Sequence, residues 1–166
     1  MSTIKPYGPE RLEELLTALG WTTFRSADGR AYLSLHPSDS PVNEIRAIWA
    51  AEGHDRSVHD IRVTSPSCTY PAGESPALLA LVNEFHNERR WPKAYLRPIA
   101  NSRVQLVAEM QYPLADGVHD ELLETLTRLA LATANDLFGW VSERYRPPAP
   151  SELDIDELEL RLRRAS

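Results

Sequence analysis

The sequence has few of the residues on which most metal and nucleotide sites depend. Cys68 is the single cysteine in 166 residues, which excludes an intrachain disulfide and a cysteine metal cluster. The seven glycines are isolated from one another, so a glycine-rich phosphate loop is not expected. No apolar run approaches the roughly 20 residues that span a bilayer. We therefore expect a cytoplasmic chain with no membrane segment, no metal and no cofactor.

Cations are also scarce, with 18 Lys and Arg against 24 Asp and Glu and a formal net charge of -6. Proteins that bind the phosphate backbone of nucleic acids depend on clustered Lys and Arg. Trp91 lies among Arg89, Arg90 and Lys93, which is the one local combination of aromatic and basic residues. A solvated helix end explains that cluster more simply, so no nucleic-acid partner is predicted.

The hydrophobic pattern predicts an α+β domain over residues 1–145. Leu12, Leu15, Leu16 and Leu19 recur at helical spacing after Pro9, and Asp28-Gly29 marks a turn between two aromatic and β-branched runs. The expected elements are a helix at 9–19, strands at 21–24, 31–35 and 44–49, a helix at 75–89, strands at 93–99 and 103–112, and a helix at 118–145. A further strand is possible at 61–64, and helix competes with strand at 44–52. Residues 65–75, with Pro66, Pro71 and Gly73, are expected to be irregular.

The last of these helices carries an apolar stripe that is too wide for one neighbour. Leu123, Ala130, Ala134 and Val141 widen it beyond a single helical face. We expect one part of the stripe to cover the sheet and the other to contact a partner or a second copy of the chain. The residues predicted for that contact are Leu122, Leu126, Leu129, Thr133, Leu137 and Trp140.

The C-terminal residues 146–166 form a separate segment in this prediction. Arg146-Pro147-Pro148-Ala149-Pro150 is typical of a stiff, extended linker, and Ser151 with Asp154 resembles a capping box for a short amphipathic helix. Ile155, Leu158 and Leu162 fall on one face of that helix. Because so short a helix is marginal alone, we expect these three residues to dock in cis or across a dimer.

Two adjacent stretches, Leu81 to Asn87 and Arg89 to Tyr95, resemble the YbjN domain family and its actinobacterial members in particular. The shared features are an N-x-x-x-N helix that runs into a W-P-K strand start. The resemblance implies a fold similar to type III secretion chaperones: a helix, three strands, a helix, two strands and a helix, often dimeric. The family is described as a sensory-transduction regulator and has no agreed biochemical activity, so the resemblance supplies a fold more than a mechanism.

Within the motif, Asn83, Asn87, Trp91 and Pro92 are interpreted as a structural joint. The two asparagines share one helix face and are expected to hydrogen-bond the Trp91-Pro92 turn, while Trp91 anchors the core. A polar binding ledge is the alternative for the asparagines.

Three histidines lie close to aspartates: His36 near Asp39, and the adjacent pairs His54-Asp55 and His59-Asp60. Adjacency in sequence does not provide catalytic geometry, so surface loop histidines are expected and no catalytic residue is assigned. The leading hypothesis is a non-enzymatic, chaperone-like module that binds a protein segment as a homodimer. The alternatives are a small hydrolase using loop histidines and carboxylates, and a small-molecule sensor.

Overall fold

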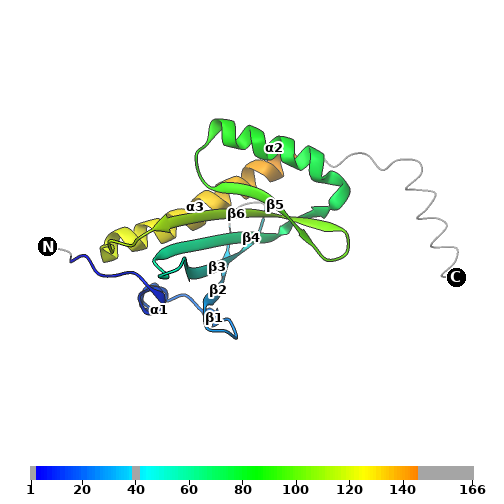
Figure 1. The fold of residues 1–166 in the computed structure, drawn as a ribbon. Coiled ribbons are helices and arrows are strands. Elements are labelled where there is room, and N and C mark those ends of the chain that lie inside the picture. The colour runs from blue at the N-terminus through cyan, green and yellow to red at the C-terminus, as the bar shows by residue number, and fades with distance from the viewer. Residues whose placement is uncertain (1–2, 39–41, 146–166) are drawn as a thin grey trace, which may run out of the picture.

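The structure, a computed structural model, describes residues 3–38 and 42–145 (Figure 1). In chain order the described elements are α1 (Pro9–Ala18), β1 (Thr23–Arg25), β2 (Ala31–Pro37), β3 (Glu44–Glu52), β4 (Val58–Pro71), the 3-10 turn η1 (Ala72–Glu74), α2 (Ser75–Glu88), β5 (Lys93–Ile99), β6 (Arg103–Pro113) and α3 (Asp120–Arg144). The predicted α+β class is confirmed. The predicted C-terminal helix, with Ile155, Leu158 and Leu162, lies outside the described residues.

The strands form one antiparallel sheet in the order β1-β2-β3-β4-β6-β5. Tyr32, Trp49, Ile61 and Met110 are register partners across four neighbouring strands, and all four are buried. Partners directly opposite each other point to the same side of a sheet, so this row marks the core face. The core face is the one that the helices cover.

All three helices pack on that face. α1 buries Leu12 and Leu16 and reaches β2 through a hydrogen bond from the Tyr32 hydroxyl to Glu13, 2.9 Å long. α2 packs on β5, and α3 crosses β4 and β6, as Figure 1 shows. The domain therefore has two layers, and the second face of the sheet has no helix over it among the described elements.

Strand β4 is longer than predicted and makes four strands before α2, where the family resemblance implied three. The prediction of an irregular segment at 65–75 was wrong for its first part, because β4 continues to Pro71. The pairing of β4 with β6 is interrupted between Thr64 and Thr69. Pro66 lies in this irregularity, where its missing N–H removes no ladder hydrogen bond.

Helix α2 begins at Ser75 as predicted, but Ser75 is not its N-cap. Glu74 occupies the cap position, and the Ser75 hydroxyl donates a 2.7 Å hydrogen bond to the Ala72 carbonyl in η1. η1 therefore joins β4 directly to α2.

Helix α3 buries one of the two overlapping stripes that the sequence offers. Its core face consists of Leu123, Thr127, Ala130, Ala134, Leu137, Phe138, Trp140 and Val141. Leu122 and Leu129 point outward and keep 47% of their surface. Among the described helices, none combines the length and apolar character that a bilayer crossing requires.

Candidate binding surface

The face of the sheet opposite the helices, here called the open face, carries an apolar patch on β1, β2 and β3. Phe24 pairs with Leu33, and Leu33 pairs with Ile48, so these three side chains point to the same side. Leu35 follows Leu33 by two residues and shares that side. Phe24 is 56% exposed and Leu35 is 47% exposed. We refer to Phe24, Leu33, Leu35 and Ile48 as the apolar patch.

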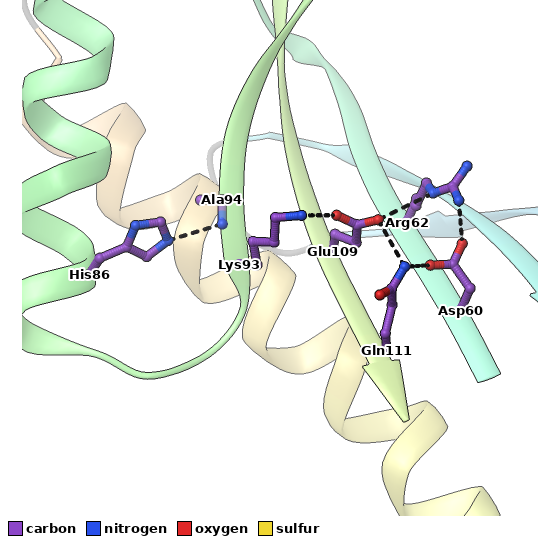
Figure 2. Close-up of polar contacts among 7 residues, drawn as sticks. All are labelled: Asp60, Arg62, His86, Lys93, Ala94, Glu109 and Gln111. Carbon is purple, nitrogen blue, oxygen red and sulfur yellow. Dashed lines mark hydrogen bonds and ion pairs between the residues drawn. The ribbon is translucent and has the colours of Figure 1, made fainter. Parts of the chain in front are cut away.

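Beside the patch, β4, β5 and β6 present a cluster of charged side chains (Figure 2). Glu109 on β6 is at its centre: Oε2 lies 2.8 Å from Lys93 Nζ, and Oε1 lies 3.5 Å from the Arg62 guanidinium. Gln111 donates through Nε2 to Asp60 Oδ1 at 2.8 Å and to Glu109 Oε1 at 3.3 Å. We call Asp60, Arg62, Lys93, Glu109 and Gln111 the ionic cluster.

Asp60 is the buried member of this cluster. Its side chain is fully shielded from solvent, and burial raises the pKa of its carboxyl, opposed by the hydrogen bond from Gln111 and by the Arg62 charge. Oδ2 has an ion pair with Arg62 at 2.8 Å but no aligned hydrogen bond. Arg62 and Gln111 together therefore offset the free energy that it costs to bury the Asp60 carboxylate.

The charges that reach solvent on the open face are mainly basic. Lys93 keeps 69% of its side chain exposed and Arg62 keeps 38%, whereas Glu109 keeps 9% and Asp60 none. On β3, Arg46 and Glu44 form an exposed pair at 2.8 Å. The open face thus offers apolar side chains next to accessible cations whose counter-charges lie underneath. Such a surface suits a ligand that carries both apolar and acidic groups.

The residues predicted as a partner surface on α3 divide into two groups. Leu122 and Leu129 are exposed and Leu126 is partly buried, so these three lie on the outer side of the helix. Thr133 is also partly buried, but its hydroxyl reaches the Met110 sulfur on the core face of β6 at 3.5 Å. Leu137 and Trp140 are buried in the core, where Trp140 packs against Phe85 of α2 with ring centroids 5.6 Å apart. The structure therefore leaves three of the six residues, Leu122, Leu126 and Leu129, on a surface that a second chain can contact.

The joint between α2 and β5 is made differently from the prediction. His86, not an asparagine, holds it: the Ala94 N–H donates to His86 Nε2 at 3.0 Å (Figure 2). Asn83 and Asn87 are exposed, and within the described part of the chain neither side chain has a hydrogen bond to the turn. Trp91 is 52% exposed and stacks on Tyr112, with ring centroids 6.1 Å apart, while Pro92 is buried. Trp91 covers the core from outside and does not lie within it.

The histidines do not form a common site. His36 and His59 both face the core and lie on either side of Trp49, whereas His54 is exposed in the turn between β3 and β4. The expectation of a surface histidine at position 59 was wrong, because His59 is fully buried in β4. His59 and Asp60 are neighbours in a strand, so their side chains point to opposite faces of the sheet. In the described part of the chain, no group of three His, Cys, Asp or Glu residues could hold a metal ion.

The ionic cluster was not predicted from the sequence. Glu109 and Gln111 alternate with apolar residues of β6, which is the local signal for a second face of that strand. The register that places Glu109 beside Arg62 and Gln111 beside Asp60 joins strands about fifty residues apart. That register cannot be read from a single sequence.

Comparison with known proteins agrees with this fold. Among curated proteins, none matches the chain significantly. Among solved structures, YbjN from E. coli, titled "a putative transcription regulator", superimposes with a TM-score of 0.69 at 15% sequence identity, covering 85% of this chain and 96% of that one. At this identity the similarity shows the fold alone. The model of the YbjN family, described as "Putative bacterial sensory transduction regulator", matches residues 8–143. The chain belongs to the YbjN family.

Proposed function

We propose that this chain is a chaperone-like regulatory module that holds a segment of a partner protein on the open face of its sheet. The observation that carries the proposal is the one-sided covering of the sheet, which leaves Phe24 and Leu35 exposed beside accessible Lys93 and Arg62. The family description, a sensory transduction regulator, supports a regulatory role. The segment that fits this surface is amphipathic and carries acidic residues.

We expect two substitutions in the apolar patch to abolish this binding. Phe24→Asp and Leu35→Asp each place a carboxylate where an apolar segment would lie, and an unpaired charge there removes at least about 1.4 kcal/mol, or tenfold in affinity. The measurement is comparative capture from native lysate, with Leu79→Asp as the matched control. Leu79 is as exposed as Leu35 but lies on α2.

The outcome that supports the proposal is a protein retained by the unchanged chain and by Leu79→Asp, and lost from both patch variants. After purification, that protein should bind the unchanged chain and Leu79→Asp more tightly than it binds either patch variant. Equal retention by all four chains would contradict a role for the open face.

The C-terminal segment has the composition that the open face favours, so we propose that it competes for this surface. Glu152, Asp154, Asp156, Glu157 and Glu159 interleave with Ile155, Leu158 and Leu162. The five-residue linker after Tyr145 reaches about 15 Å if it is extended at about 3.1 Å per residue. In the capture experiment, a chain ending at Pro147 should retain more partner than the full chain, and equal retention would argue against this competition.

We further propose that the outer face of α3 forms a homodimer contact. Leu122 and Leu129 are seven residues apart and therefore lie on one side of the helix, with Leu126 between them. Light scattering should give about twice the chain mass of 18.7 kDa. Leu129→Asp should return the mass to that of one chain, whereas Leu79→Asp should not. A single-chain mass for the unchanged protein at micromolar concentration would remove this part of the proposal.

A further inference from the structure

A surface cavity of about 260 Å³ lies at one end of the sheet. It is bounded by the start of α1, the turn before β2, and the turn between β3 and β4. The lining residues are Pro9, Arg30, Ala51, Glu52, Gly53, His54 and Arg56. None of them belongs to the apolar patch or to the ionic cluster, so the cavity is a separate feature of the molecule.

The two arginines in this cavity have no direct ion pair among the described residues, although the charge of Arg30 contributes to the lowered pKa of Asp28. Within the described residues, neither the Arg30 nor the Arg56 guanidinium forms an ion pair or a hydrogen bond. By contrast, Arg11, Arg46, Arg62, Arg128 and Arg144 each lie within 4 Å of a carboxylate. Other described arginines, such as Arg89 and Arg90, also form no ion pair, so what distinguishes Arg30 and Arg56 is that they line one cavity. Like charges placed together repel unless an anion lies between them.

The nearby aspartates are engaged within their own turns. Asp28 accepts from the Ser26 hydroxyl at 2.6 Å and from the Arg30 N–H at 3.1 Å. Asp55 accepts from the Ser57 hydroxyl at 2.7 Å and from the Ser57 N–H at 3.2 Å. These hydrogen bonds lower the pKa of both carboxyls, so the aspartates stay ionised and tied to the backbone. They fix the turns that present Arg30 and Arg56.

The start of α1 adds the positive end of a helix dipole, which Glu10 in the first turn partly offsets. Pro9 is in the first turn of this ten-residue helix, and Gly8 at its N-cap provides no side-chain capping bond. The positive end of the helix dipole therefore borders the same cavity as the two guanidiniums and the His54 imidazole. Glu52 is the one acidic residue in the lining.

We propose that this cavity binds a small phosphate-bearing metabolite. Guanidinium groups match the oxygens of a phosphate in a bidentate manner, and Arg30 and Arg56 come from separate turns, so they can hold one group from two sides. The volume of about 260 Å³ is below the range of roughly 300–1,000 Å³ usual for ligand pockets, which restricts the ligand to a very small molecule. Glu52 supplies an acceptor for a hydroxyl or amino group on the same ligand.

The test is a titration of the full chain with inorganic phosphate, monitored through the NMR chemical shifts of the backbone amides. Chloride is used to keep the ionic strength constant throughout the titration. The expected result is a saturable shift with a dissociation constant in the millimolar range, confined to residues 9–11, 29–31 and 51–57. Arg30→Gln combined with Arg56→Gln should weaken binding at least tenfold, and the corresponding double lysine variant should give an intermediate affinity because it keeps charge without the bidentate geometry.

The matched control is Arg90→Gln, which removes another exposed arginine, outside the cavity, and should leave the phosphate affinity unchanged. Both glutamine variants replace exposed side chains, and an unchanged thermal unfolding temperature will show that they fold. Shifts spread over all basic residues without saturation, or the same affinity in the double variant, would overturn the proposal. The result is independent of partner binding, because Phe24→Asp should retain phosphate affinity.

Discussion

Lowering the pH from 7 to 4 should remove about 3 kcal/mol of folding free energy through His59 alone. Burial lowers the pKa of this ring from 6.5 to about 4 in the folded chain. The unfolded chain then binds a proton at higher pH than the folded one, so stability falls as the pH drops through the window from 6.5 to 4. Well above pH 6.5 the ring is unprotonated in both states and the effect vanishes.

The contacts of His59 explain why the folded chain resists protonation. The Thr127 hydroxyl donates to the Leu123 carbonyl at 2.7 Å, so it can only accept from His59 Nε2–H, 3.0 Å away. Nδ1 is then the unprotonated nitrogen and accepts from the Tyr7 hydroxyl at 2.8 Å. A second proton on the ring would face the Tyr7 hydroxyl hydrogen in a site with no solvent.

The measurement is urea unfolding at several pH values between 4 and 7, with His59→Gln as the matched variant. A glutamine amide offers one donor and one acceptor and does not titrate, so the variant should lose most of the slope below pH 6.5. His36, whose pKa burial also lowers, will contribute a smaller slope of the same sign. If His59→Gln and the unchanged chain show the same dependence on pH, the buried ring does not control acid stability.

The same histidine shows where sequence reasoning ended. In the sequence, the pair His59-Asp60 has the same pattern as the pair His54-Asp55, which is exposed in the structure. The strand periodicity of β4 sends one side chain to the α3 interface and the other to the open face, and only the position of the strand in the sheet decides which is which. A pattern of two neighbouring polar residues gives no information on that choice.

Helix α3 shows a similar limit. The spacing predicted a long helix and a stripe wider than one face, and both are present. The sequence could not decide which part of that wide stripe faces the sheet. In the structure Thr127 is fully buried with its hydroxyl 3.0 Å from His59 Nε2, while Leu122 and Leu129 remain exposed.

Residues with local patterns were predicted well, and residues whose role depends on distant partners were not. The turn at Asp28-Gly29 and the W-P-K strand start follow from chemistry within a few residues. The ionic cluster on the open face depends on the register of three strands and therefore belongs to the second kind. Its contribution to the free energy of unfolding can be measured by substitution.

Glu109→Ala should reduce the free energy of unfolding by about 2–3 kcal/mol, because it leaves Arg62 and Lys93 without the carboxylate that both contact. This is below the roughly 3–5 kcal/mol usual for a broken buried pair, because Lys93 is 69% exposed to water and Arg62 keeps its ion pair with Asp60 at 2.8 Å. For a chain of this length the corresponding fall in unfolding temperature is roughly 5–10 °C, measured by calorimetry.

The matched control is Glu44→Ala, which breaks the exposed pair with Arg46 on the same face and should cost less than about 1 kcal/mol. If the two variants lose the same free energy of unfolding, the ionic cluster contributes no more to stability than an exposed surface ion pair. A larger loss for Glu109→Ala would mean that the shielded Glu109 carboxylate positions the accessible Lys93 and Arg62 side chains of the open face. In that case Glu109→Ala should also weaken partner binding by more than Glu44→Ala does, because Lys93 and Arg62 would no longer be held in the orientation that an acidic segment meets.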